Sequence, residues 1–272
     1  MTAYESDSEE LIVELDGRVA RLTLNRPEAR NALSDGITKN LVRAIRWAAI
    51  DDEVGAVLLT GAGQAFCSGG DVKRMNQDAR RDRRPSESAQ LDALKSRHQG
   101  IAGALRALLK PSVAALPGPA AGAGLAIALC CDFRIGAPNA LISTGYANIG
   151  MSGDYGIAWL LTRTVGPAAA RALLLTSDRI PADQAKQLGI FNEVVDEAHL
   201  QDEALTLARR LAAGPLVAYA AIKKNLDDAL DVDHHTAINR EAERLLACRQ
   251  TQDYREAIQA FAQRRPPNFK GQ

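Results

Sequence analysis

The sequence lacks a charge excess and a long apolar run. Its 272 residues carry 33 basic and 33 acidic side chains, so the formal net charge is zero. That balance gives no reason to expect binding to nucleic acid or to a membrane surface. No apolar run reaches the ~18–20 residues that a membrane span needs, and the first ten residues, MTAYESDSEE, are acidic rather than basic and then apolar. We therefore expect a cytoplasmic protein with no membrane partner.

Metal and nucleotide motifs are missing too. The four cysteines have neither metal-ligand nor disulfide-framework spacing, which predicts reduced, mostly buried thiols and no metal site. They are Cys67, Cys130, Cys131 and Cys248. A dinucleotide-binding loop could begin at Gly122-x-Gly124, but Ile127 occupies the place of the third glycine and no acidic residue follows at ~20 residues' distance. The Gly-Lys-Ser/Thr of a phosphate-loop NTPase is also absent.

The stretch Lys110–Asp132 is the most informative part of what is present. It runs from a short apolar segment through a Gly/Ala-rich loop into a helix-like apolar segment. Between Gly118 and Gly124 it has almost no side chains, so a ligand could approach the backbone closely. A helix that begins near Gly124 would direct its free N–H groups at that ligand. The stretch therefore predicts a site for an anion, either permanent or formed during a reaction.

The order of the expected elements favours an α/β fold. Leu11–Leu15 and Val19–Leu24 are typical of a hairpin with a tight Asp-Gly turn. Ser34 is the expected N-cap of a helix over 35–50. Strands are expected at 56–60, 113–116, 133–135 and 140–143, and a helix at 124–131. Repeated ββα units gather the loops that follow strands on one side.

The second half of the chain is mostly helical in pattern. Helices are expected at 158–165, 168–175, 182–188, 202–213 and 215–230, with one long amphipathic helix over 234–263. Residues 73–100 are polar and Arg-rich, without clear periodicity before about Leu91. They are expected to form a solvated loop; a lid, or a basic rim for a phosphate-bearing ligand, is the alternative.

Two small-residue loops each follow a short strand. One is Phe66–Asp71 and the other lies within the Lys110–Asp132 stretch. Each could present one backbone N–H to a shared pocket, and two converging N–H donors make an oxyanion hole. Spacing alone leaves ordinary turns as the alternative.

Five ordered motifs resemble those of the crotonase superfamily, the enoyl-CoA hydratase/isomerase family. They are NRPEARNAL (25–33), AFCSGGD (65–71), the stretch Lys110–Asp132, the segment from LLTSDRI (174–180) to Val195, and RRPPNFK (264–270). The resemblance implies an α/β fold with a repeated ββα spiral core over 1–200 that binds acyl-CoA. It also implies a helical trimerisation region over 201–272, in a homotrimer or a hexamer of two trimers.

The resemblance further implies that a thioester carbonyl oxygen lies between two backbone N–H groups. By position these belong to Gly70 and Ala123. Family members often have glycine in place of Ala123, and the alanine keeps the N–H but narrows the approach. Because the oxyanion exists only along the reaction path, fixed N–H dipoles lower the barrier selectively. No separate cofactor is implied, since coenzyme A is part of the substrate.

The acid/base groups depart from the family pattern. Hydratases of the family carry two glutamates, which by position fall on Ala126 and Tyr146. Neither side chain exchanges a proton as a carboxylate does, so ordinary hydration of an enoyl-CoA is not expected. Asp154 instead matches the working aspartate of isomerase and dehalogenase branches, and partial desolvation could raise its pKa enough for proton shuttling. The alternative is an aspartate that satisfies N–H groups in a glycine turn.

Other site residues are expected from the same resemblance. His98 is a second catalytic candidate, close to a histidine of the dehalogenase branch, and a surface or core histidine is the alternative. Asp71 is expected to brace the first oxyanion loop. The residues expected to bind CoA or line the acyl pocket are Glu28, Ala29, Arg30, Ser68, Gly69 and Tyr146, with the basic run 73–84 near the phosphates and with Phe269 and Lys270 reaching a neighbouring subunit's CoA.

Two interpretations of function remain. The first is an acyl-CoA isomerase, or a related lyase or hydrolase, that uses Asp154 with the Gly70 and Ala123 N–H groups. The second is a non-catalytic acyl-CoA-binding protein of the same fold. Ala126 and Tyr146 favour the second interpretation, whereas Asp154 favours the first.

Overall fold

A six-stranded sheet with the order β1-β2-β3-β4-β6-β9 organises the chain. The computed structural model describes residues 4, 6–71 and 85–272. The strands are β1 (Leu11–Asp16), β2 (Val19–Leu24), β3 (Ala56–Gly61), β4 (Ser112–Leu116), β6 (Phe133–Gly136) and β9 (Glu193–Val194). β1 and β2 form an antiparallel hairpin, and the later pairs are parallel. The predicted hairpin and the strands expected at 56–60, 113–116 and 133–135 are confirmed.

After β4 the chain enters a second, smaller sheet. It consists of β5 (Ala120–Ala121), β7 (Leu141–Ser143) and β8 (Ile180–Pro181), in that order. β5 runs parallel to β7, and β7 runs antiparallel to β8. Helix α5 (Ala123–Cys130) therefore begins immediately after a strand that lies outside the main sheet.

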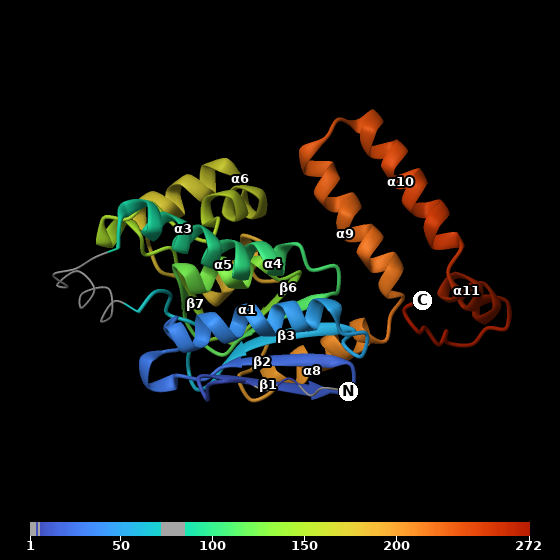
Figure 1. Ribbon diagram of the computed structural model, residues 1–272, viewed down its shortest axis with the longest axis horizontal. Coiled ribbons are helices and arrows are strands. Elements are labelled where there is room, and N and C mark those ends of the chain that lie inside the picture. The colour runs from blue at the N-terminus through green and yellow to red at the C-terminus, as the bar shows by residue number, and fades with distance from the viewer. Residues whose placement is uncertain (1–3, 5, 72–84) are drawn as a thin grey trace.

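Both faces of the main sheet are buried, as is usual for parallel strands. On one face, Val57 and Leu59 of β3 pack into a core with α1 (Asp35–Ile50) and α5. The side chain of Ser34 caps α1 by accepting a hydrogen bond from the Ile37 N–H at 3.0 Å, as the sequence predicts. Figure 1 shows α1 along the sheet, with α3 (Glu87–His98), α4 (Ala104–Arg106), α5 and α6 (Ile157–Thr176) gathered beside it.

Helix α8 (Leu200–Ala212) covers the opposite face of the sheet. Its stripe of Ala204, Ala208 and Ala212, each four residues apart, is fully or almost fully buried. These small side chains allow the close approach, since a Cβ on Gly55 would lie 2.6 Å from the Ala212 carbonyl oxygen. Helix α8 therefore packs against the core, and the helices that stand apart from it begin with α9.

The structure corrects two expectations about helices. The single helix expected over 234–263 is broken into α10 (His234–Arg249) and α11 (Gln252–Ala262). The break occurs because Thr251 adopts an extended backbone and caps α11 by accepting from the Tyr254 N–H at 3.1 Å. Part of the loop expected over 73–100 is the helix α3, which begins after the cap residue Ser86. Residues 72–84 of that segment lie outside the described residues.

The remaining short elements are η1 (Pro27–Ala29), the π-helical turn η2 (Gln99–Gly103), η3 (Ala147–Ile149) and α7 (Ala182–Gln187). Helix α6 contains the two helical patterns expected at 158–165 and 168–175. Gly166, at φ 79° and ψ 163°, separates them just before Pro167. The kink explains why two shorter patterns appear in the sequence.

The helical arm, α9 (Leu216–Asp231) with α10 and α11, projects from the core in Figure 1. Ion pairs tie α9 to the core: Lys223 Nζ lies 2.7 Å from Asp132 Oδ2, and Arg163 Nη2 lies 3.1 Å from Asp231 Oδ1. In the described part of the chain no single helix is long and apolar enough to cross a membrane. Helices α8 and α9 reach that length and composition only as a pair, which is bent by 103°.

Candidate active site

Two loops meet at the carboxyl ends of β3 and β4. The Cys67 N–H donates to the Pro119 carbonyl at 3.3 Å, and the Ala121 N–H donates to the Cys67 carbonyl at 2.9 Å. Only glycine fits at two points of this contact. A Cβ on Gly69, which has φ 91°, would lie 2.8 Å from the Ala121 oxygen, and one on Gly124 would lie 2.3 Å from the Cys67 oxygen. The two small-residue loops of the sequence are therefore in direct backbone contact.

Gly70 and Ala123 both line one cavity of about 210 Å³. Ala123 is the first residue of α5, so its N–H lies at a helix N-terminus and has no acceptor within the helix. Among the described residues, neither N–H donates a hydrogen bond to another group. The site therefore offers two unused donors to the oxygen of a ligand.

A carboxylate faces the same cavity from the loop between η3 and α6. Asp154 is half-buried there, and Tyr146 Oη donates a hydrogen bond to its Oδ1. Burial raises the pKa of Asp154, while the Tyr146 hydrogen bond and the charge of His98 act against that rise. The pKa of Tyr146 is raised, first by burial and then by Asp154, so its hydroxyl stays protonated and able to donate. Asp154 is thus a carboxylate whose pKa is shifted toward the range useful for a general base.

The loop that carries Asp154 has an uncommon backbone. Gly150, Gly153 and Gly156 have φ of 69°, 126° and 78°, and Tyr155, which is not a glycine, has φ 48°. A bulky residue in the left-handed region is strained. In this conformation the consecutive residues Asp154 and Tyr155 both line the cavity.

His98, the last residue of α3, completes the cavity wall. Its ring packs on that of Tyr155, with centroids 4.3 Å apart and planes 44° apart. Burial lowers the pKa of His98, and the negative charge of Asp154 opposes that effect. The structure therefore brings the four residues expected to be catalytic, Gly70, Ala123, Asp154 and His98, to one cavity.

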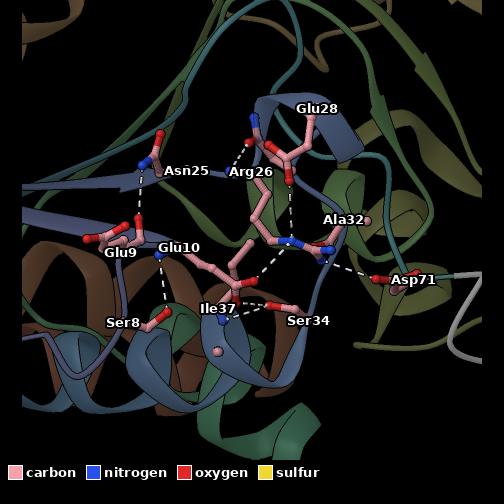
Figure 2. Close-up of polar contacts among 12 residues, drawn as sticks. Ser8, Glu9, Glu10, Asn25, Arg26, Glu28, Ala32, Ser34, Ile37 and Asp71 are labelled. Atoms are coloured by element: carbon pink, nitrogen blue, oxygen red, sulfur yellow. Dashed lines mark hydrogen bonds and ion pairs between the residues drawn. The ribbon is translucent and has the colours of Figure 1, made fainter.

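Arg26 braces the first loop from outside the cavity. Figure 2 shows its guanidinium among Glu10, Glu28 and Asp71, with Nε 3.2 Å from Glu10 Oε1 and Nη1 3.1 Å from Asp71 Oδ2. Nη1 also donates to the Ala32 carbonyl at 3.1 Å. Because Asp71 follows Gly70 directly, this network fixes the backbone beside one of the two donors. It agrees with the bracing role expected of Asp71.

Asn31 also holds the first loop in place. Like Arg26, it was not predicted from the sequence. It is fully buried, and its side-chain amide donates to the Ala62 and Ala65 carbonyls at 3.0 and 2.8 Å. Its Oδ1 accepts from the Arg26 N–H at 2.8 Å. Arg26 and Asn31 both lie in the motif NRPEARNAL (25–33). This motif is the sequence signal that could have identified them.

Comparisons with known proteins identify the family. The family model described as Enoyl-CoA hydratase/isomerase matches residues 14–272. The chain belongs to the enoyl-CoA hydratase/isomerase family. It is an acyl-CoA enzyme of this family, within the crotonase superfamily that its motifs resemble.

Relatives in the family carry both hydratase and isomerase names. The chain is 33% identical over 261 residues to the short-chain-enoyl-CoA hydratase of Clostridium acetobutylicum, covering 94% of this chain and 95% of that one. It is 34% identical over 255 residues to the 1,2-epoxyphenylacetyl-CoA isomerase of Escherichia coli, covering 93% and 95%.

Solved structures of the family share the fold. An enoyl-CoA hydratase from Polaromonas sp. JS666 superposes with a TM-score of 0.88 at 32% identity, covering 95% of this chain and 98% of that one. A Streptomyces coelicolor A3(2) structure reaches a TM-score of 0.92 at 34% identity, covering 100% and 98%. The crotonase-type α/β fold is therefore confirmed.

The residues expected to bind CoA fall into two groups. Ser68 lies against the loop after η1, where its N–H donates to the Arg30 carbonyl at 2.9 Å and its Oγ to the Ala29 carbonyl at 3.4 Å. Glu28, Ala29 and Arg30 therefore lie next to Ser68 and Gly69 of the first small-residue loop. Arg30 is exposed.

Phe269 and Lys270 lie elsewhere, in a tail folded against α11. The buried Asp253 accepts hydrogen bonds from the Lys270 and Gly271 N–H groups at 2.7 and 2.9 Å. The C-terminus lies beside the near ends of α9 and α11 in Figure 1, away from α3 and α5. Within one chain these two residues do not join the cavity.

The two positions that the resemblance gives to hydratase glutamates are both buried. Ala126 is fully buried in α5, and Tyr146 is nearly so. The Tyr146 ring lies near the second loop, because a Cβ on Gly122 would be 3.7 Å from its Cζ. The match to family glutamates stays a prediction, but the groups present are a methyl and a phenol.

The described residues contain no group of three or more His, Cys, Asp or Glu side chains placed to hold a metal ion. Cys67, Cys130 and Cys131 are buried and free, and burial raises the pKa of each thiol to about 12. Cys248 is free and only partly buried. The expectation of reduced, mostly buried thiols agrees with these environments.

Proposed function

We propose that this protein is an acyl-CoA isomerase of its family, with Asp154 as the group that moves the proton. The observation that carries the proposal is one cavity bordered by two unused N–H donors, Gly70 and Ala123, and by a half-buried carboxylate. Relatives of this chain are named both as hydratases and as isomerases, so membership of the family is compatible with this choice. The reaction needs no group beyond the protein and the CoA thioester itself.

The proposed chemistry moves a carbon–carbon double bond by proton transfer. The Asp154 carboxylate takes a proton from the α or γ carbon of the acyl group, and the electron pair delocalises to the thioester oxygen. The Gly70 and Ala123 N–H groups hold that oxyanion, and such donors are each worth about 10²–10³ in rate. Asp154 then returns the proton to the other carbon, which leaves the thioester intact and the double bond displaced.

Neighbours of Asp154 support this role. Burial raises its pKa, so that the carboxylate is a stronger base than an exposed aspartate. Tyr146 donates to one carboxylate oxygen and leaves the other for the substrate. Hydration is disfavoured because Ala126 supplies no second acid/base group near α5.

Proton exchange tests the role of Asp154. In ²H₂O, NMR follows deuterium entering the α and γ carbons of a 3-enoyl-CoA. Asp154→Asn is expected to lower the exchange rate by about 10²–10⁴-fold, while isothermal titration still shows acyl-CoA binding. The matched control is Asp178→Asn, because Asp178 is exposed and lies outside the cavity.

Two outcomes would contradict the proposal. Equal exchange in wild type and Asp154→Asn would remove Asp154 from the reaction. Tight binding of acyl-CoA with no exchange and no turnover in wild type would favour a non-catalytic binding protein instead.

We also propose that the protein works as a homotrimer or a hexamer of two trimers, with the helical arm α9–α11 at the interface. The support is a set of exposed apolar side chains on the arm. They include Ile222, Leu226, Leu230, Ile238, Leu245, Leu246, Ile258 and Phe261, with exposed fractions from 50% to 86%. Such a surface normally packs against another chain.

A further inference from the structure

A second cavity lies directly behind the catalytic one. It has a volume of about 260 Å³, and its apolar lining includes Ala102, Cys130 and Leu160. His98 and Tyr155 border both cavities. Because their rings are in contact at 4.3 Å between centroids, the ring pair forms a partition between the two spaces.

The partition is held firmly on the Tyr155 side. Tyr155 is 5% exposed and belongs to the hydrophobic core, although its φ of 48° strains a residue with a bulky side chain. Such strain persists only where surrounding packing fixes it. Glycine would adopt this backbone without strain, so the packing of the Tyr155 ring must offset the local backbone preference.

Trp159 also lines the second cavity. Its ring is covered by Arg163, whose Cζ lies 3.8 Å from the ring centroid, and Arg106 lies 5.5 Å away. The space between the partition and Trp159 has an apolar side at Ala102, Cys130 and Leu160, beside the polar Gln99 and Arg106, so an alkyl chain could pack along its apolar side. The Asp154 carboxylate lies on the catalytic side, next to Tyr155 in the sequence.

We propose that the His98–Tyr155 ring pair closes the acyl end of the site and makes this protein selective for short acyl groups. The inference rests on the proposed function, because it requires an acyl-CoA at the Gly70 and Ala123 N–H groups. The catalytic cavity of about 210 Å³ is smaller than the ~300–1,000 Å³ of sites that hold drug-sized ligands. If the catalytic cavity opened into the second cavity, their combined volume would fall within that range.

Chain-length dependence of binding tests the partition. Isothermal titration with acetyl-, butanoyl- and octanoyl-CoA, which are saturated and cannot isomerise, gives a dissociation constant for each. In wild type the octanoyl and butanoyl constants are expected to lie within about threefold, since extra methylenes find no apolar space. Full burial would instead tighten binding about fourfold per methylene.

Tyr155→Gly is the main variant, because it removes the ring and suits the left-handed backbone. It is expected to raise the ratio of octanoyl- to butanoyl-CoA affinity at least tenfold. Adding Ala102→Leu, which fills the second cavity, is expected to return the ratio to the wild-type value. Tyr155→Phe keeps the ring and is the matched control, with an unchanged ratio.

A second variant, His98→Ala, tests the partition in case Tyr155→Gly does not fold. His98 is only partly buried at the end of α3, so His98→Ala removes the other half of the partition at smaller cost. It is expected to raise the same ratio at least threefold, with folding checked by circular dichroism.

The outcomes separate this inference from the proposed function. An unchanged ratio in folded Tyr155→Gly and His98→Ala would overturn the partition alone. So would a wild type that gains about fourfold per methylene, because the chain would then leave by another route, such as between Leu94 and Met151. No binding of any acyl-CoA to wild type would overturn both proposals.

Discussion

Asp154 and Tyr146 lie at the two ends of one short loop and work as a unit. Burial raises the pKa of the carboxyl group, and the Tyr146 hydroxyl lowers it by hydrogen bonding to the ionised form. The phenol thus offsets part of the desolvation without neutralising the base. It also fixes one carboxylate oxygen, which sets the direction of the other.

Removal of that hydroxyl should shift the pH dependence of proton exchange. In Tyr146→Phe the pKa of Asp154 loses a lowering influence and rises further. A general base must be deprotonated, so the acidic limb of kcat/KM moves to higher pH, and the rate at neutral pH falls by about tenfold, as expected for a lost hydrogen bond to a charged group. Exchange measured by NMR from pH 5 to 9 checks the shift.

Tyr254→Phe is the control, because Tyr254 is exposed on α11. Its acidic limb should coincide with that of wild type. A limb that stays in place, or moves to lower pH, in Tyr146→Phe would show that the phenol does not tune Asp154.

At the scale of elements, the relative position of the Gly70 and Ala123 N–H groups depends on how closely α5 approaches the first loop. Gly124 lies in the first turn of α5, and its Cα faces Cys67 without room for a side chain. The parallel bridge between Cys67 and Ala120 holds the same contact from the strand side. The relative position of the two N–H donors is therefore a property of this backbone contact.

Gly124→Ala should push α5 away from Cys67. The added Cβ would meet the Cys67 carbonyl oxygen at 2.3 Å, which is backbone and cannot rotate away. We expect the free energy of unfolding to fall by about 1–3 kcal/mol and exchange to fall by more than about 10²-fold, as for a lost oxyanion donor. Chemical denaturation and NMR exchange measure the two effects.

Gly103→Ala is the matched control for that substitution. Its Cβ would meet only the end of the flexible Gln99 side chain. Because Gly103 is helical, the change should leave stability equal or raise it by up to about 1 kcal/mol. Similar loss of exchange in both variants would mean that the α5 contact has no special role.

The elements that the sequence predicts well are those whose signals are local. The β1–β2 hairpin has its Asp-Gly turn, and α1 has its Ser34 cap followed by apolar residues at helical spacing. The break at Thr251 was missed because the apolar pattern continues across it. The placement of α8 was missed although its alanine stripe is the usual sign of a close approach to another layer.

The site was predictable only in part for the same reason. Gly70 and Ala123 follow from motifs that lie directly on the chain. The contact of Tyr146 with Asp154, and of His98 with Tyr155, depends on a loop with four positive φ angles, which no local pattern specifies. Arg26 and Asn31 act through hydrogen bonds to residues distant in sequence, so their roles needed the folded chain.

For the whole molecule, the helical arm is the part whose packing is incomplete. Helices α9, α10 and α11 contain just two buried residues, Asp253 and Ala260. Ion pairs join α9 to the core at Asp132 and Arg163. We therefore expect a second chain to bury these apolar side chains.

Two charges on the arm should therefore dissociate the assembly. Wild type is expected to be a trimer or a hexamer by light scattering, and Leu245→Glu combined with Phe261→Glu a monomer with unchanged circular dichroism. Leu245 is 55% exposed and Phe261 86% exposed, so the substitutions disturb little within one chain. Gln259→Glu, which adds a charge at an exposed polar position of α11, should leave the assembly intact. A monomeric wild type, or a double variant that stays assembled, would place the interface elsewhere.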